Sequence, residues 1–264
     1  MSASESDDGG IRVERRGDVD LVTIDRPEVR NALSLESFAA LRRAVLDTTA
    51  RCLVITGAGS AFCSGDDVRK VMGGGDGRAT AERLAAKPRV TPAGHALLTT
   101  DVPVIAAVNG PAVGWGMELA LMCDLRVASE RARFGALFVL RGLCCDVAGL
   151  ARLAALVGRE HATELLLTGD VIDAAEALRV GLVSRVVPDA ELLPTALRLA
   201  DKIAANPPLA VARIKQGLRR ALDPDWESLG AWVSGSLAEL FTTADHQEGV
   251  RAFLEKRPPR FVGK

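Results

Sequence analysis

The sequence has no excess of charge of either sign and no acidic or basic tail. Its 264 residues include 33 basic and 34 acidic side chains, which gives a net charge of -1. The lack of a basic stripe argues against binding to nucleic acid, and the lack of an acidic tail argues against a charge-driven protein partner. Any anionic ligand must therefore be held by local groups.

Motifs for metals, disulfides and membranes are also missing. The five cysteines form no C-x-x-C pair, and the three histidines share no metal-ligand spacing. We therefore expect buried structural thiols in a reducing compartment, and no metal site. The sequence shows neither a secretory leader nor an apolar run long enough to cross a bilayer. These features predict a soluble, cytoplasmic protein without a membrane partner.

The order of the apolar runs is typical of an α/β fold. With 48% hydrophobic residues, the chain has enough apolar side chains for a large core. Two β-like runs, 11–16 and 19–25, predict a hairpin. Buried strands are predicted at 51–57, 103–110 and 124–129. The last two flank a helical run, and this crossover pattern predicts a sheet that is at least partly parallel.

The chain divides into three predicted parts. Residues 1–10 form a small, acidic lead that we expect to be disordered. Residues 11–188 form the α/β core, which also contains a predicted strand over 181–187. Residues 189–264 form a helical region with four predicted helices, at about 190–205, 208–221, 226–240 and 245–256.

Two buried strands run into similar glycine-rich turns. LVITGAGSAFCSGDDV leads to a predicted helix start at Asp66-Asp67, and VIAAVNGPAVGWGMEL leads to one near Trp115-Gly116. Unpaired N–H groups at two converging helix starts would suit an oxyanion on a bound carbonyl. Ordinary turn chemistry also explains glycines after a buried strand, so both interpretations stay open.

Glu118 is the one carboxylate inside the apolar, helix-forming run GWGMELALMCD. Such a charge normally faces solvent, so its position indicates a functional role. An apolar pocket would raise its pKa, whereas a helix N-terminus would lower it. The sequence leaves the balance between these two effects open.

Several motifs together resemble the enoyl-CoA hydratase/isomerase (crotonase) family. They cover nearly the whole chain after the first ten residues, and they are RPEVRNALS (26–34), AFCSGDDV (61–68), VIAAVNGPAVGWGMELALMCDLRVASERARFG (104–135), HATELLLTGDVIDAAEALRVGLVSRVV (161–187) and the ending EGVRAFLEKRPPRF. The resemblance implies a crotonase-like spiral of β-β-α turns with a helical C-terminal region for trimerisation. It implies an acyl-CoA thioester as substrate, bound in the core, and a homotrimer or a dimer of trimers. No cofactor is implied, because coenzyme A is part of the substrate.

The same resemblance implies the residues of the site. The backbone N–H groups of Asp66 and Trp115 would form the oxyanion hole, and Glu118 matches the first catalytic glutamate. Trp115 departs from the family pattern, which usually has glycine there, and this leaves the size of the substrate open. The residues implied to contact CoA or substrate are Arg26, Arg30, Ala32, Asp66, Asp67, Val68, Arg69, Phe138, Phe253 and Lys256. The last two would approach the CoA phosphates, either in the same subunit or from a neighbour.

The second catalytic glutamate of the family hydratases is replaced by Phe138. Hydration needs a water polarised between two carboxylates, and a phenyl ring cannot take part in that. Asp146 matches an aspartate that transfers protons in dienoyl-CoA isomerases of this family, and one that acts as nucleophile in 4-chlorobenzoyl-CoA dehalogenase. A simple helix N-cap is the alternative for Asp146.

The sequence therefore favours double-bond isomerisation by Glu118 and Asp146. Three alternatives remain: an enoyl-CoA hydratase with a modified site, an aromatic acyl-CoA hydrolase or dehalogenase that uses Asp146 as nucleophile, and an acyl-CoA-binding paralogue without catalysis. Phe138 and Trp115 are the features that favour the last of these.

Overall fold

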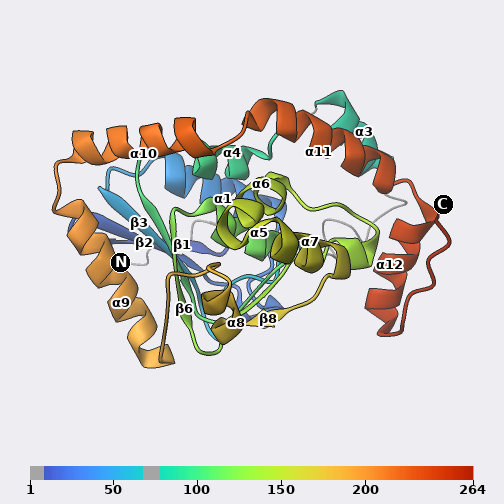
Figure 1. Ribbon diagram of the computed structural model, residues 1–264, viewed down its shortest axis with the longest axis horizontal. Coiled ribbons are helices and arrows are strands. Elements are labelled where there is room, and N and C mark those ends of the chain that lie inside the picture. The colour runs from blue at the N-terminus through green and yellow to red at the C-terminus, as the bar shows by residue number, and fades with distance from the viewer. Residues whose placement is uncertain (1–8, 68–77, 88, 264) are drawn as a thin grey trace, which may run out of the picture.

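A six-stranded sheet forms the centre of the protein. The computed structural model describes residues 9–67, 78–87 and 89–263 (Figure 1), so most of the predicted N-terminal lead lies outside the described residues. The strands lie in the order β1 (Ile11–Arg16), β2 (Val19–Ile24), β3 (Cys52–Gly57), β4 (Val104–Val108), β6 (Leu125–Ser129) and β9 (Arg185–Val187). The β1–β2 hairpin is antiparallel and every later pair is parallel, which confirms the predicted hairpin and crossovers. The predicted strand over 181–187 is shortened, because only its last three residues pair with β6.

Helices cover both faces of this sheet. On one face lie α1 (Leu35–Leu46), α4 (Pro92–Thr99) and α5 (Trp115–Met122), with α6 (Val147–Val157) packed on α5. The other face is covered by α9 (Asp189–Ala204), whose alanines and Leu192 contact the strands (Figure 1). Helix α1 begins at its predicted cap, since Ser34 Oγ accepts the Ser37 N–H at 3.3 Å. All residues of β2, β3 and β4 are buried between the two layers.

A small second sheet places the start of α5. It contains β5 (Pro111–Val113), β7 (Arg133–Gly135) and β8 (Ile172–Asp173), with β7 between the other two. Strand β5 leads through Gly114, which has a φ of 56° and is the N-cap of α5. The remaining short elements are η1 (Pro27–Val29), α3 (Arg78–Ala86), η2 (Val139–Arg141), α7 (Arg159–Thr168) and α8 (Ala174–Arg179).

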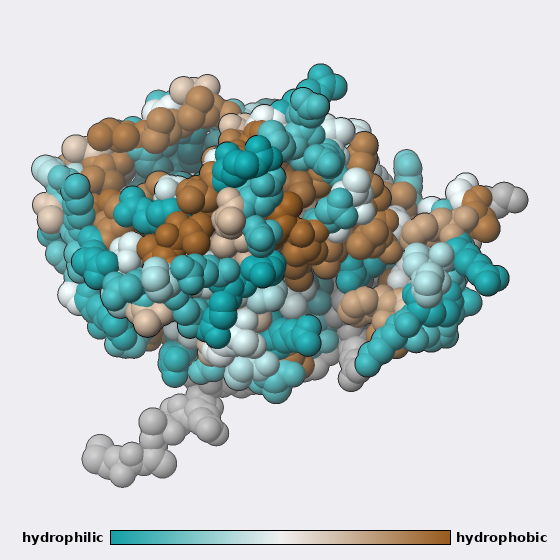
Figure 2. Space-filling view, turned by 60° about the horizontal axis from the view of Figure 1, so that its bottom comes forward, coloured by the Kyte–Doolittle hydropathy of each residue, from teal (hydrophilic) through white to brown (hydrophobic). Residues whose placement is uncertain are grey.

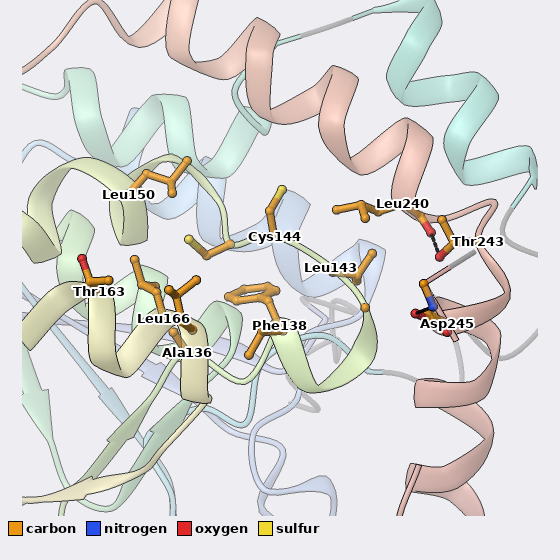
Figure 3. A pocket seen from close by; sticks show the side chains of 15 residues that line it. Ala136, Phe138, Leu143, Cys144, Leu150, Thr163, Leu166, Leu240, Thr243 and Asp245 are labelled. Atoms are coloured by element: carbon orange, nitrogen blue, oxygen red, sulfur yellow. Dashed lines mark hydrogen bonds between the residues drawn. The ribbon is translucent and has the colours of Figure 1, made fainter. Parts of the chain in front are cut away.

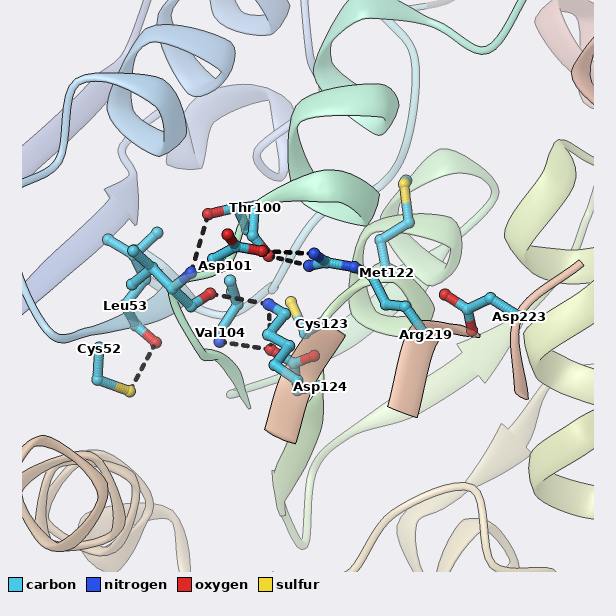
Figure 4. Close-up of polar contacts among 12 residues, drawn as sticks. Cys52, Leu53, Thr100, Asp101, Val104, Met122, Cys123, Asp124, Arg219 and Asp223 are labelled. Carbon is cyan, nitrogen blue, oxygen red and sulfur yellow. Dashed lines mark hydrogen bonds and ion pairs between the residues drawn. The ribbon is translucent and has the colours of Figure 1, made fainter. Parts of the chain in front are cut away.

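The last helices extend along the molecule, as the sequence predicts. After α9 they are α10 (Pro208–Leu222), α11 (Trp226–Leu240) and α12 (Ala244–Glu255), and in Figure 1 α12 lies at the end opposite α9. Helix α10 is fixed to the core by an ion pair between buried Lys215 and partly exposed Asp124, in which Lys215 Nζ lies 2.6 Å from Asp124 Oδ2. The same carboxylate accepts the Val104 N–H at 2.8 Å, and Arg219 pairs with Asp101 nearby (Figure 4).

The burial of the cysteines agrees with the expectation from composition. All five cysteines are free, and four are buried, with Cys144 partly exposed. Within the described part of the chain, no helix combines the length and apolar character needed to cross a membrane.

Candidate active site

A cavity of about 540 Å³ lies where α5 begins, and we call it the amide cavity. Its wall includes the backbone of both glycine-rich turns, the η1 loop and the end of α12. Eight predicted site residues line it: Arg30, Ala32, Asp66, Asp67, Trp115, Phe138, Phe253 and Lys256. Phe253 and Lys256 therefore reach this cavity within the same chain.

Gly65, the residue before Asp66, lies beside the Trp115 amide. A Cβ added at Gly65, whose φ is +90°, would lie 3.0 Å from the Trp115 nitrogen. Glycine is therefore needed here so that the chain before Asp66 can approach the start of α5. Trp115 is the first residue of α5, and its N–H has no acceptor among the described residues.

The backbone conformation of Asp66 differs from the predicted helix start. It forms an isolated β-bridge with Leu33, and the flanking bonds run from Leu33 N to Gly65 O at 2.8 Å and from Asp67 N to Leu33 O at 2.9 Å. The predicted helix start at Asp66-Asp67 is therefore wrong for Asp66, because pairing with the η1 loop holds it in a bridge. Burial, and then Asp146, raise the pKa of the Asp66 carboxyl to about 6, and its own amide and Arg141 oppose this shift.

Glu118 lies in the first turn of α5 and is 1% exposed. The N–H of Gly149 on α6 donates to both of its carboxylate oxygens, at 2.9 Å to Oε2 and 3.1 Å to Oε1. Burial and the nearby Asp146 raise the pKa of Glu118 well above its usual value, against the effect of the amides of Gly149, Ala148 and Asp146. Burial and the charge of Asp146 thus outweigh the amides at the start of α6.

Asp146 is both the N-cap of α6 and an electrostatic neighbour of Glu118. Its Oδ1 accepts the Val147 N–H at 2.8 Å, and its Oδ2 has no hydrogen bond within the described part of the chain. Burial raises the pKa of Asp146, while the Val147 amide and the Trp115 side chain lower it. The capping role is therefore confirmed, and it leaves one oxygen available.

The Trp115 indole packs against α1. Its ring meets Phe38 of α1 edge-on, with centroids 4.6 Å apart and an interplanar angle of 88°. Trp115 is 4% exposed, and its Nε1 is the buried side-chain nitrogen that lacks a hydrogen bond in the described residues. The indole lies close enough to lower the pKa of Asp146, but the pair makes no hydrogen bond of ordinary geometry.

A second cavity of about 630 Å³ adjoins the first, and we call it the apolar cavity (Figure 3). Phe138 and Leu143 line both cavities, so they form the wall between them. Neither Glu118 nor Asp146 lines either cavity. The adjacent Cys144 and Cys145 do line the apolar cavity, and the charge of Glu118 raises the pKa of both thiols.

One predicted contact residue, Arg26, is not in the cavity wall, and two others lie outside the described residues. Arg26 instead holds the η1 loop, because it donates to the carbonyl oxygen of Ala32 and pairs with Asp67 at 3.4 Å. Val68 and Arg69 lie outside the described residues, so their predicted role stays a prediction.

Arg141 is a cavity residue that sequence analysis missed. Its guanidinium carbon lies 4.6 Å from the centroid of the Phe253 ring, and its Nη1 donates to Leu137 O at 2.9 Å. The charge of Asp66 opposes the lowering of the Arg141 pKa by burial. The available signal was a single cation in the otherwise apolar stretch FGALFVLRGLCC.

Comparison with known proteins identifies the family of this site. A family model described as enoyl-CoA hydratase/isomerase matches residues 14–264. The chain belongs to the enoyl-CoA hydratase/isomerase family. A short-chain-enoyl-CoA hydratase of Clostridium acetobutylicum is 38% identical over 254 residues, which cover 94% of this chain and 95% of that protein.

Solved structures of the family share the fold. An enoyl-CoA hydratase/isomerase from Pseudoalteromonas atlantica has a TM-score of 0.82 at 30% identity, covering 96% of this chain and 100% of that one. A monofunctional enoyl-CoA isomerase from M. smegmatis has a TM-score of 0.68 at 33% identity, covering 82% and 95%. The predicted crotonase-like α/β fold with a helical C-terminal region is confirmed, and this enoyl-CoA hydratase/isomerase acts on acyl-CoA as a lyase or an isomerase.

Proposed function

We propose that this enzyme moves the double bond of an enoyl-CoA thioester in preference to adding water to it. The observation that carries the proposal is the burial of Glu118 near Asp146, whose charge raises the pKa of Glu118, together with Phe138 in the cavity wall. Two carboxyl groups with different environments can serve as acid and base. Hydration by two glutamates would need a carboxylate where the ring of Phe138 stands.

The thioester oxygen would be held in the amide cavity by the N–H groups of Asp66 and Trp115. The free N–H of Trp115 and the glycine at position 65 support this assignment. Amides already aimed at the oxygen stabilise the negative charge of an enolate without reorganisation during the reaction. Arg30 and Lys256 in the same cavity supply positive charge for the CoA phosphates. No further cofactor is assigned, because these groups and the two carboxyls provide the parts that proton transfer needs.

The electrostatic environment suggests how Glu118 and Asp146 share the work. Burial raises the pKa of both carboxyls; the charge of Asp146 raises that of Glu118 further, whereas the Val147 amide and the Trp115 indole partly offset the shift at Asp146. We therefore assign Asp146 as the base that removes a proton from one carbon, and Glu118 as the acid that protonates another. Proton exchange between the two groups and solvent then restores the starting state. Neither carboxyl lines either cavity in this structure, so we expect the cavity walls to rearrange when the acyl chain enters.

Kinetics with 2-enoyl-, 3-enoyl- and dienoyl-CoA test the proposal. Glu118→Gln and Asp146→Asn should each reduce isomerisation by about 100-fold or more, as expected for loss of a general acid or base. Asp201→Asn, the same change at an exposed position on α9, is the matched control and should leave the rate unchanged. Rapid hydration of crotonyl-CoA that survives Asp146→Asn would refute the isomerase preference. An acyl–aspartyl intermediate trapped at Asp146 would instead indicate hydrolysis.

We also propose that the C-terminal helices assemble the chain into a trimer or a dimer of trimers, as its family resemblance implies. Ile214, Leu218 and Leu222 lie one turn apart on α10 and are all more than half exposed, at 63%, 55% and 71%. Apolar surface also covers a broad part of the face shown in Figure 2. Light scattering after size-exclusion chromatography should give the mass of three or six chains, and a monomer at micromolar concentration would contradict the proposal.

A further inference from the structure

The helix that carries the Trp115 amide is short, and its two ends are close. Helix α5 has eight residues, so its C-terminal carbonyl groups lie about 12 Å from that amide. The negative end of a helix dipole at that distance opposes the binding of an anion at the positive end. A short helix therefore binds an enolate more tightly when its C-terminal end is neutralised.

Arginine side chains satisfy the carbonyl groups at this end of α5. Nη1 of Arg126 donates to Cys123 O at 2.8 Å and to Ala120 O at 3.3 Å. Nη1 of Arg152 donates to Met122 O at 2.9 Å. Cations that bond to the last carbonyl groups of a helix oppose the negative end of its dipole. The end of α5 is therefore both capped and partly neutralised by these two guanidinium groups.

Arg126 differs from the other cations here because it has no carboxylate partner. Lys215 pairs with Asp124 at 2.6 Å. Arg152 pairs with Asp223 at 2.9 Å. Within the described part of the chain, Arg126 makes no ion pair, and its guanidinium donates to carbonyl oxygens alone. Three cations and two carboxylates thus leave one net positive charge at the C-terminal end of α5.

This unpaired cation is buried, which is costly. Arg126 lies on β6 and is 7% exposed, and its Nε donates to Leu182 O at 2.8 Å. Burial lowers the pKa of Arg126, and the charge of nearby Arg152 lowers it further, but a guanidinium stays protonated at neutral pH. A neutral donor could cap the helix without the cost of burying a charge. The charge itself therefore indicates a role beyond capping.

We propose that Arg126 is a positioning residue of the acyl-CoA site, which stabilises a bound enolate through α5. Its cation holds the last turn of α5 and neutralises the negative end of the helix, so that the field at the Trp115 amide favours the anion. The inference rests on the proposed function, in which that amide binds the thioester oxygen. A unit charge about 12 Å away changes the stability of an anion by about three- to tenfold at effective dielectric constants of roughly 20 to 40.

Binding of acetoacetyl-CoA and butyryl-CoA tests the inference without turnover. The acetoacetyl group ionises to an enolate, which absorbs in the near ultraviolet, and the butyryl group does not ionise. In Arg126→Gln, which removes the charge, affinity for the enolate should fall about three- to tenfold, and affinity for butyryl-CoA should be unchanged. Arg126→Lys keeps the charge and should stay within about twofold of wild type. Arg198→Gln, the same change at an exposed arginine of α9 on the other face of the sheet, is the matched control and should change neither affinity.

A second variant changes the charge without altering Arg126, and it decides the question if Arg126→Gln fails to fold. Oδ2 of Asp223 accepts from Arg152 at 2.9 Å and from Trp226 Nε1 at 3.2 Å. Asp223→Asn keeps an accepting oxygen and frees the charge of Arg152, so enolate affinity should rise about two- to fivefold. Unchanged enolate affinity in either charge variant, or equal losses in Arg126→Gln and Arg126→Lys, would overturn the proposal and leave Arg126 as a helix cap. An equal loss of affinity for both ligands in Arg126→Gln would overturn it as well.

The outcomes separate this inference from the proposed function. Enolate affinity that follows these charges, without isomerisation, would support the inference and refute the proposed reaction. Isomerisation together with an enolate affinity that ignores the charges would refute the inference alone. If wild type binds no enolate, the assignment of the oxyanion amides is wrong, and the inference is overturned with it.

Discussion

Gly149→Ala is the most direct test of how Glu118 is held. The Gly149 amide donates to both oxygens of Glu118, and a Cβ at this position would lie 2.5 Å from Oε1. The same Cβ would lie 3.1 Å from the Cβ and Sγ of Cys145. Since ordinary contact begins near 3.4 Å, the carboxylate must retreat by roughly 1 Å.

Two opposing effects set the change in stability. Alanine inside α6 would stabilise the helix by up to about 1 kcal/mol relative to glycine. Loss of the hydrogen bond to the neutral Glu118 carboxyl and overpacking against Cys145 together cost about 2 kcal/mol. We therefore expect a net loss of about 1 kcal/mol, which lowers Tm by about 3 °C in a chain of this size. Displacement of a catalytic group by about 1 Å should lower kcat by roughly 100-fold.

The chain offers controls for the helix effect. An alanine Cβ at Gly217 in α10 or at Gly235 in α11 would meet no atom within 4 Å. Both substitutions should therefore raise the free energy of unfolding by about 0.5–1 kcal/mol and leave kcat unchanged. Thermal unfolding followed by circular dichroism, together with isomerisation kinetics, measures both quantities. If Gly149→Ala gains the same stability as the controls and keeps the wild-type kcat, the contact between α6 and Glu118 is wrong.

Three further predictions concern side chains of the site and the core. Trp115→Phe keeps the backbone amide but removes the indole N–H that lowers the pKa of Asp146. The acid limb of the pH–rate profile should therefore move to higher pH, and an unchanged limb would contradict this prediction. Because Glu118 has a raised pKa when folded, the folded protein retains a proton that the unfolded chain releases above about pH 4, and its stability declines as pH rises. The free energy of unfolding of Glu118→Gln should therefore equal that of wild type near pH 5 and exceed it near pH 8, as measured by urea titration. An equal difference between the two proteins at both pH values would contradict this prediction. Lys215→Met leaves the partly exposed Asp124 carboxylate without its lysine partner and should cost about 2 kcal/mol, measured by urea denaturation. A loss below about 1 kcal/mol would show that this pair does not anchor α10.

Features that depend on neighbouring residues could be predicted from the sequence. The β1–β2 hairpin, the cap at Ser34 and the four C-terminal helices follow from alternation, capping chemistry and helical periodicity. Each of these signals acts over a few residues, so tertiary contacts had little to change. The motif around Glu118 also indicated the family and the carboxyl groups to consider.

Features that depend on contacts between distant segments required the tertiary structure. The bridge between Leu33 and Asp66 replaced a predicted helix start, and the amide of Gly149 met a carboxylate 31 positions away along the chain. The direction of the Trp115 ring, the place of Arg141 and the division of the cavity by Phe138 likewise depend on packing between separate elements. Local sequence determines which backbone conformations are favourable. Which side chains then share a buried space depends on how the whole chain excludes water, and the shift in the pKa of Glu118 follows from that burial.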